Sequence, residues 1–272
     1  MTQLDTGTED LLAEIDDGVA VLTMNRPDRR NAMSEAMMTA MDRALGEVET
    51  DDSVGCVVLT GAGGAFCAGG DVKAMAERSA GERGPTLDAV IHRQRLRQRA
   101  TSGRLWEMPK PTIAAISGPA AGAGLSLALA CDLRYAVDGA VLTTAFARVG
   151  FSGDYGGTWF LTRLAGSAKA KELYYFSDRL SAADAERLGI VNAVFPAADF
   201  DAEVRRRARR LAEGPRLAYR YMKENLNRAV NGDLGECMDV EATHHIHTGL
   251  TQDHREAARA FVERREPRFT GR

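Results

Sequence analysis

The chain has 272 residues, of which 44% are hydrophobic, and carries a formal net charge of −3 at pH 7. This length and apolar content are enough for a substantial buried core. The weak charge gives no electrostatic reason to expect nucleic acid or an anionic membrane as the main partner. No apolar run reaches the roughly 18 residues of a membrane span, and residues 1–10 do not resemble a signal segment, so we expect a soluble protein with no membrane partner.

The first third of the chain predicts a hairpin, a helix and a strand. Residues 11–15 and 19–24 are β-type runs around Asp16-Asp17-Gly18. Ser34 is the expected N-cap of an amphipathic helix that ends near Thr50, and residues 54–60 predict the next strand. A glycine-rich loop then covers residues 61–73, and Asp71 is expected to cap a helix that begins at Val72. The loop lacks the spacing of a dinucleotide or phosphate loop.

Residues 87–106 predict a helix with a run of arginines between Arg93 and Arg104. Such a run is typical of a solvated face, and the alternative is contact with phosphate or RNA. Residues 111–116 then predict a buried strand, the glycines at 118–124 a turn, and the small apolar residues up to Asp132 a buried helix. The free N–H groups and positive dipole end of that helix favour a ligand with a developing negative charge.

Residues 132–137 and 140–146 predict further extended segments, and a third glycine-rich loop follows at 148–159. Asp154 lies in this loop among Phe151, Tyr155 and Trp159. If these rings enclose it, burial raises the pKa of Asp154 and makes it a competent base. The alternative is a turn-forming aspartate before two glycines.

The last part of the chain changes in composition. After a short helix at 181–188 and a strand at 190–195, four helices are predicted at 200–213, 216–230, 234–246 and 252–265. The three histidines at 244, 245 and 247 lack an acidic ligand at helical spacing, so no metal site is expected. The four cysteines have neither disulfide nor zinc spacing, which indicates a reducing, cytoplasmic setting.

Several of these segments together resemble the crotonase (enoyl-CoA hydratase/isomerase) superfamily: residues 65–73 (AFCAGGDVK), 113–132, 149–158, Asn-Arg-Pro at 25–27 and AFVERR at 260–265. The likeness covers essentially the whole chain in the same order. It implies an α/β fold, a spiral of ββα units over residues 1–197 that binds acyl-CoA, and a helical C-terminal trimerisation region over residues 198–272. It also implies an acyl-CoA substrate, no separate cofactor because coenzyme A is part of the substrate, no nucleic acid, and a homotrimer or dimer of trimers.

Members of this superfamily stabilise a thioester enolate with two backbone N–H groups, which map by motif onto Gly70 and Ala123. Preorganised donors suit this task because the thioester oxygen gains charge as the α-carbon loses a proton. By the same resemblance, the contacts to coenzyme A map onto Arg29, Arg30, Ala68, Lys73, Phe261 and Arg264, of which the last two reach the nucleotide of a neighbouring subunit. Asp28 stands where hydratases often have a lysine, which puts that one phosphate contact in question.

The sequence departs from the hydratases at two positions. Hydratases use two glutamates to position and activate water, and the corresponding residues here are Ser126 and Phe146. We expect Ser126 to hydrogen-bond back to the carbonyl of Gly122 and Phe146 to supply only bulk. Asp154 then remains as the proton-transfer group, as in isomerases that resemble this chain in having an acidic residue there.

Three functions stay open at this point. The first is an isomerase in which Asp154 shuttles a proton while Gly70 and Ala123 hold the enolate oxygen. The second is an enoyl-CoA hydratase, with Asp154 activating water. The third is a non-catalytic acyl-CoA or RNA-binding homologue, for which the arginine run is the only support.

Overall fold

The computed structural model describes residues 1–71 and 85–272, and its core is a seven-stranded sheet in the order β1-β2-β3-β4-β5-β7-β10. The first three strands are antiparallel, and the pairs from β3 to β10 are parallel. The strands of this sheet are β1 (Thr2–Leu4), β2 (Leu11–Asp16), β3 (Val19–Met24), β4 (Cys56–Gly61), β5 (Thr112–Ile116), β7 (Leu133–Val137) and β10 (Ala193–Phe195). A smaller sheet joins β6 (Ala120–Ala121), β8 (Val141–Thr143) and β9 (Leu180–Ser181).

The helices follow the predicted order along the chain. Within the described residues the α-helices are α1 (Glu35–Thr50), α3 (Leu87–Gln98), α4 (Arg104–Glu107), α5 (Ala123–Ala130), α6 (Gly157–Ala165), α7 (Ser167–Phe176), α8 (Ala182–Arg187), α9 (Phe200–Ala212), α10 (Arg216–Ala229), α11 (Leu234–Gly249) and α12 (Gln252–Glu263). Shorter helical pieces are η1 (Pro27–Arg29), a π-helix η2 (Arg99–Gly103) that joins α3 to α4, and η3 (Ala147–Val149). None of the described helices has the length and apolar content that a membrane span requires.

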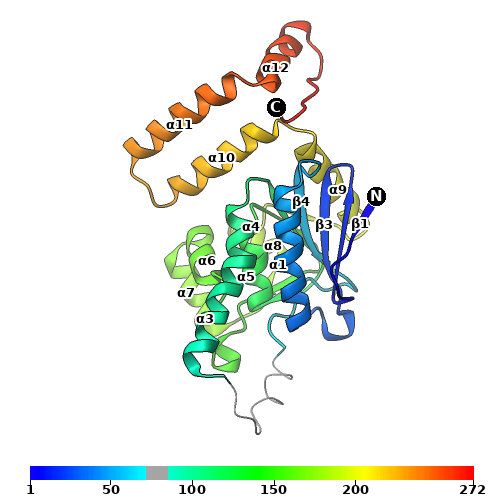
Figure 1. The fold of residues 1–272 in the computed structure, drawn as a ribbon. Coiled ribbons are helices and arrows are strands. Elements are labelled where there is room, and N and C mark those ends of the chain that lie inside the picture. Colours follow the sequence, from blue (N-terminus) through cyan, green and yellow to red (C-terminus); the bar gives the residue numbers. More distant parts are fainter. Residues whose placement is uncertain (72–84) are drawn as a thin grey trace.

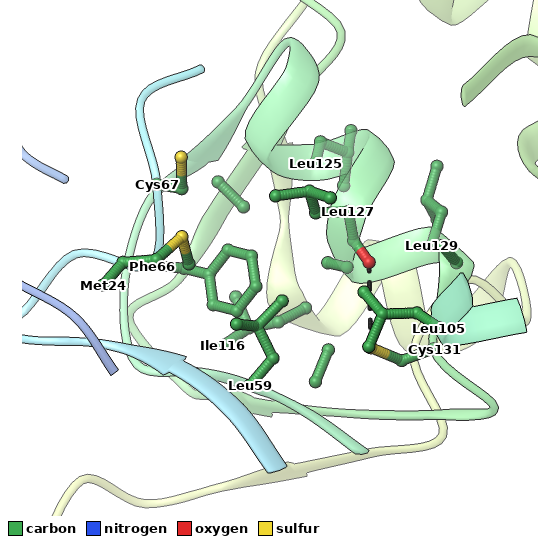
Figure 2. Close-up of a cluster of buried hydrophobic side chains, with 14 of the residues drawn as sticks. Met24, Leu59, Phe66, Cys67, Leu105, Ile116, Leu125, Leu127, Leu129 and Cys131 are labelled. Carbon is green, nitrogen blue, oxygen red and sulfur yellow. Dashed lines mark hydrogen bonds between the residues drawn. The ribbon is translucent and has the colours of Figure 1, made fainter. Parts of the chain in front are cut away.

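The period-two pattern of β4 decides which residues enter which core. Val57 and Leu59 point to one face of the sheet, where α1 and α5 pack, while Cys56 and Val58 point to the other, which α9 covers. Figure 2 shows the first of these cores, with Leu125, Leu127 and Leu129 of α5 packed over the sheet. Complete burial of each such leucine is worth about 1.5–3 kcal/mol, so α5 is fixed firmly against the sheet.

Most of the predicted elements are confirmed. The hairpin at 11–24 forms, and the Ser34 hydroxyl accepts a hydrogen bond from the Met37 N–H as the N-cap of α1. The extended segment predicted at 140–146 is wrong in its second half, because the strand ends at Thr143 and Phe146 begins a 3₁₀ turn. The helix expected from Val72 lies outside the described residues.

Helices α11 and α12 stand away from the body that holds the sheets (Figure 1), and α10 contacts that body through Lys223, which donates to Leu105 O and Lys110 O. These three helices expose large apolar side chains: Met222, Leu226, Leu234, Met238, Ile246, Leu250, Phe261 and Val262. In contrast, α9 packs its buried face, which includes Phe200 and Val204, onto the large sheet. The proposed division of the chain near residue 198 therefore falls just before a helix that packs on the core.

Candidate active site

The turn that leads into α5 leaves the backbone N–H of Ala123 free at the start of the helix. Gly122 adopts φ 53°, ψ −127°, a conformation that the glycine allows without steric cost, and Ala123 is the first helical residue. The Ala123 N–H donates no hydrogen bond to the described part of the chain. It is thus an unpaired donor at the positive end of a buried helix.

A second free N–H comes from the first glycine-rich loop, at Gly70. This loop is fixed to the start of α5 by backbone hydrogen bonds, from Ala121 N to Cys67 O at 2.9 Å and from Cys67 N to Pro119 O at 3.2 Å. An ideal Cβ on Gly69 would lie 3.3 Å from Ala123 N, which shows how closely the loop approaches the helix. As with Ala123, no hydrogen bond from the Gly70 N–H to the residues described here is formed.

Asp154 faces the same cavity as these two donors. Gly70, Ala123 and Asp154 line one cavity of about 310 Å³, whose wall also includes Met33 and Tyr155. The Tyr155 N–H donates to Gln98 Oε1 at 2.5 Å, which ties the third glycine-rich loop to the end of α3. The structure thus brings together the three residues that the sequence proposed for catalysis.

The Asp154 carboxyl group is enclosed but not paired. Its Oδ1 atom is buried and has no hydrogen-bond partner in the described chain. Burial raises the pKa of Asp154 from 3.8 to about 6. At neutral pH the group is therefore mostly ionised, yet basic enough to accept a proton from carbon.

The three rings expected to enclose Asp154 do not do so as a set. Tyr155 lines the cavity, but Phe151 is 56% exposed, so the condition is not met for this ring. Trp159 packs on Trp106, with ring centroids 5.1 Å apart. Gly153, at φ 111°, lies between Phe151 and Asp154 in the loop.

Tyr174 on α7 is a neighbour of Asp154 that the sequence did not predict. The negative charge of Asp154 contributes, after burial, to raising the pKa of the Tyr174 phenol, which keeps this group neutral. Nothing in the local sequence of α7 marks Tyr174, because its place depends on how α7 packs on β8. Thr144 Oγ1 donates to Leu173 O at 2.7 Å and Thr143 Oγ1 donates to Ser177 O at 3.0 Å.

The two positions that hold glutamates in hydratases are buried in this protein. Ser126 is 1% exposed, and its hydroxyl donates to Gly122 O at 3.3 Å, which confirms the expected back-bond. Phe146 is 6% exposed and stacks on the ring of Tyr174, with centroids 5.8 Å apart and planes 9° from parallel. Neither residue can act as a base here.

Two ion pairs occupy the wall of the cavity. Arg26 Nη2 lies 3.3 Å from Asp71 Oδ2, and Arg26 Nη1 donates to Ala32 O. Arg26 therefore connects the residue after Gly70 to the segment that precedes α1. Arg97 of α3 pairs with Glu35 at the start of α1. This pairing shows that at least one member of the arginine run is engaged with an acidic side chain.

The residues proposed to bind coenzyme A lie in three places. Arg29, Arg30 and Ala68 are exposed and adjacent, since the Ala68 N–H donates to Arg30 O at 2.9 Å. Lys73 lies outside the described residues. Phe261, which is 86% exposed, and Arg264 lie on and just after α12, at the other end of the molecule from α3 in Figure 1. In the described chain, no group of three or more histidine, cysteine, aspartate or glutamate side chains is arranged to hold a metal ion.

Comparisons with known proteins agree with this architecture. The family model for enoyl-CoA hydratase/isomerase matches residues 14–272. The chain is 36% identical over 264 residues to a 1,2-epoxyphenylacetyl-CoA isomerase of Escherichia coli (strain K12), covering 97% of this chain and 99% of the relative. It is 35% identical over 225 residues to 4-chlorobenzoyl coenzyme A dehalogenase-2 of an Arthrobacter species, covering 83% and 80%.

Solved structures show the same likeness. A crystal structure of an enoyl-CoA hydratase from Polaromonas sp. JS666 superposes with a TM-score of 0.88 at 32% identity, covering 96% of this chain and 99% of the other. The relatives thus share the fold and differ in the reaction that their names describe.

Proposed function

The chain belongs to the enoyl-CoA hydratase/isomerase family of enzymes, and we propose that it is an isomerase that moves a double bond, or opens a strained ring, in an acyl-CoA thioester. The observation that supports this proposal is the Asp154 carboxyl group, whose buried Oδ1 atom has no hydrogen-bond partner in the described chain. Asp154 lines a cavity with two free backbone N–H groups, while both glutamate positions of the hydratases hold residues that cannot transfer a proton.

In the proposed mechanism, the thioester oxygen accepts hydrogen bonds from the N–H groups of Gly70 and Ala123. Asp154 removes a proton from a carbon conjugated with the thioester, the C–H electron pair forms a new carbon–carbon double bond, and the thioester carbonyl becomes an enolate. The enolate then collapses and takes a proton back from Asp154 at a different carbon, after the carboxyl proton has had the opportunity to exchange with solvent. Atoms and charge balance without water or another reactant.

The electrostatics of the cavity support each half of this cycle. A carboxylate whose pKa is about 6 is a stronger base than an exposed aspartate and still ionised at neutral pH. Donors at the start of α5 need no reorganisation when the oxygen gains charge, and such donors contribute about 2.7–4 kcal/mol each in related chemistry.

Hydration of an enoyl-CoA is the alternative function, favoured by the likeness to a solved hydratase. It requires a group that activates water and one that delivers a proton to carbon. Of the carboxyl groups in the described lining of the cavity, Glu35 and Asp71 are paired with arginines, and Asp154 is the one with a buried oxygen that has no hydrogen-bond partner in the described chain. A non-catalytic RNA-binding role has less support, because Arg97 and Arg104 are paired with carboxylates.

The test of the proposed function separates these alternatives by product mass. A panel of linear, branched and aromatic enoyl-CoA thioesters is incubated with the enzyme, and the products are weighed by mass spectrometry. An isomerase gives products of unchanged mass and, in deuterium oxide, incorporates deuterium. Asp154→Asn should abolish this exchange, whereas Asp138→Asn, which changes an exposed carboxylate in a turn, should leave it intact. Exchange by Asp154→Asn at a near-normal rate, or products heavier by one water, would refute the isomerase proposal.

For the remaining contacts, we propose that Arg29, Arg30, Ala68 and Lys73 bind coenzyme A and that Phe261 and Arg264 reach the nucleotide bound to a neighbouring subunit. The exposed apolar side chains of α10–α12 support assembly into a homotrimer or a dimer of trimers, because a monomer rarely leaves so many large apolar groups in water. The four unpaired cysteines support a reducing, cytoplasmic setting.

A further inference from the structure

Asn31 is a buried polar residue beside the first glycine-rich loop that the mechanism proposed above does not use. It is 0% exposed and adopts φ 57°, a left-handed conformation that asparagine accepts more readily than most residues. Its Nδ2 atom donates to Ala62 O at 2.9 Å and to Ala65 O at 2.8 Å, and its Oδ1 atom accepts the Arg26 N–H at 2.8 Å. The amide group is thus bonded at both its nitrogen and its oxygen, and it connects the turn at 26–31 to the glycine-rich loop.

The main chain on either side of Asn31 supports the part of the loop that precedes Gly70. The Met33 N–H donates to Gly69 O at 2.8 Å. The carbonyl of the residue before Asn31 accepts the Ala68 N–H at 2.9 Å. Residues 30–33, which we call the support segment, therefore hold the loop by two backbone hydrogen bonds, one on each side of the buried asparagine.

The thiol of Cys67 adds a third link between the support segment and the loop. Cys67 is 0% exposed, and its thiol donates to Asn31 O at 3.0 Å and accepts the Gly69 N–H at 3.4 Å. Burial raises the pKa of this thiol to about 12, so it keeps its proton and remains a donor at neutral pH. Together with the bond from Met33, this contact leaves both polar groups of the Gly69 main chain hydrogen-bonded.

The hydrogen bond to Gly69 O determines the direction of the Gly70 N–H. The peptide unit between the two glycines is planar and trans, so its carbonyl and its N–H point in opposite directions. Because the carbonyl is directed at Met33, the N–H is directed away from the support segment. The Gly70 N–H is therefore left unpaired in the described chain, as one of the two free donors of the cavity.

We propose that Asn31 is a positioning residue, which holds the support segment against the loop and so directs the Gly70 N–H toward the thioester oxygen. Asn31 acts through the Met33 N–H and the Gly69–Gly70 peptide and does not touch the reacting atoms. The catalytic part of this inference rests on the proposed function, whereas the orientation of the Gly69–Gly70 peptide is a property of the unliganded protein.

The first test observes this peptide directly and needs no substrate. The sequence contains three Gly–Gly pairs, at 63–64, 69–70 and 156–157. Labelling glycine with ¹³C at the carbonyl and with ¹⁵N gives three cross peaks in a TROSY-HNCO spectrum, one from each pair. The pair at 156–157 lies in the third glycine-rich loop and serves as the internal control.

Asn31→Gly removes the amide but keeps the turn, because glycine adopts positive φ without steric cost. The Gly69 carbonyl resonance should move to lower frequency, because this carbonyl loses or weakens its hydrogen bond from Met33. Asn31→Asp keeps the acceptor oxygen and lacks the Nδ2 donors, so it should move the resonance in the same direction and keeps the inference testable should Asn31→Gly fold poorly. A residue that only stabilises the fold would leave the 69–70 peak of the folded variant in place, so an unmoved peak in either folded variant overturns the proposal.

Asn25→Ala is the matched control variant. The Asn25 amide also donates to a backbone carbonyl, Glu9 O, at 2.9 Å, but this bond connects the segment to residue 9 and not to the loop that carries Gly70. The variant should leave the 69–70 peak in place. A displacement in Asn25→Ala as large as that in Asn31→Gly would overturn the proposal, because the peak would then respond to any change in this segment.

The second test connects this orientation to catalysis. With an acyl-CoA thioester into which the wild type exchanges deuterium, Asn31→Gly and Asn31→Asp should lower kcat by about 10- to 100-fold, because a misdirected donor loses part of its stabilisation of the enolate oxygen. The change in KM should be smaller, since the donor matters most when the oxygen is charged. Asn25→Ala should exchange at the wild-type rate. A displaced 69–70 peak with unchanged kcat would overturn the catalytic role of Asn31, whereas exchange by Asp154→Asn at a near-normal rate would instead count against the proposed function.

Discussion

Asp154→Asn should stabilise the protein at neutral pH while it removes the proton shuttle. Burial raises the pKa of Asp154 from 3.8 to about 6, so the ionised side chain is less stable in the folded than in the unfolded chain. At about 1.4 kcal/mol per pH unit, this difference corresponds to about 3 kcal/mol. Because part of the side chain reaches solvent, screening reduces the value, and we expect a gain of about 1–3 kcal/mol.

The sign of the pH dependence follows from proton binding. Between about pH 4 and pH 6 the folded wild type holds the Asp154 proton and the unfolded chain has released it, so the free energy of unfolding falls as pH rises through this window. The unscreened effect is about 1 kcal/mol near pH 4.5 and about 3 kcal/mol near pH 7.5. Asparagine cannot ionise, so the advantage of Asp154→Asn should grow by up to about 2 kcal/mol between these two conditions.

Urea unfolding of the wild type and Asp154→Asn, at equal protein concentration near pH 4.5 and near pH 7.5, measures this difference. Comparing the two conditions removes contributions of the amide that do not depend on pH. Asp138→Asn, which neutralises an exposed carboxylate, is the control and should show no comparable growth. A constant difference at both pH values, or a loss of stability that increases with pH, would show that Asp154 is not held in an environment that opposes its charge. In the same series, the rate of deuterium exchange by the wild type should rise with pH to a plateau, with a midpoint near the Asp154 pKa of about 6.

Three further substitutions test the scaffold. Gly124→Ala should lower the free energy of unfolding in urea by roughly 1–3 kcal/mol, because the added Cβ would lie 2.5 Å from Cys67 O, a backbone atom of the loop that carries Gly70. An unchanged urea midpoint would contradict this close packing. Lys223→Met should lower the free energy of unfolding by about 3–5 kcal/mol, since Lys223 Nζ lies 2.9 Å from Asp132 Oδ2 and its removal leaves a partly buried carboxylate without its cation. The double variant with Asp132→Asn should recover part of that loss, because no carboxylate is then left unpaired at this position. Leu226→Glu should shift the sedimentation coefficient toward that of a monomer, as this leucine is 68% exposed on α10, and an unaltered assembly would exclude α10 from the interface.

The parts of the fold that were predictable depend on contacts close in sequence. The Ser34 cap needs only the next three residues, and the back-bond from Ser126 to Gly122 follows from helical spacing once the start of α5 is placed. The sequence also predicted the strand, glycine turn and apolar helix at 112–130, because each of these segments has its own hydrophobic period or turn residues. Family resemblance was needed to pair Gly70 with Ala123, which are 53 positions apart.

The features that escaped prediction depend on tertiary packing. Tyr174 stacks on Phe146 because α7 is held by hydrogen bonds from Thr143 and Thr144, and no local sequence pattern marks that contact. Phe151 was one of three rings near Asp154 in sequence that could have enclosed it, yet Phe151 is 56% exposed, with Gly153 at φ 111° between the two residues. Proximity along a glycine-rich loop is therefore weak evidence for proximity in space.

The packing around Ser126 also explains why the chemistry of this site depends on one carboxyl group. Ser126 Oγ and the Tyr174 hydroxyl oxygen both lie beside Gly157, where an ideal Cβ on this glycine would meet them at 2.2 and 2.6 Å. The longer side chain of a glutamate at position 126 would therefore compete for space with the neutral phenol of Tyr174. A second carboxylate there would lie near Asp154 and raise its pKa further, which would lower the ionised fraction at neutral pH. The neutral side chains at this point instead leave Asp154 free to exchange a proton with substrate.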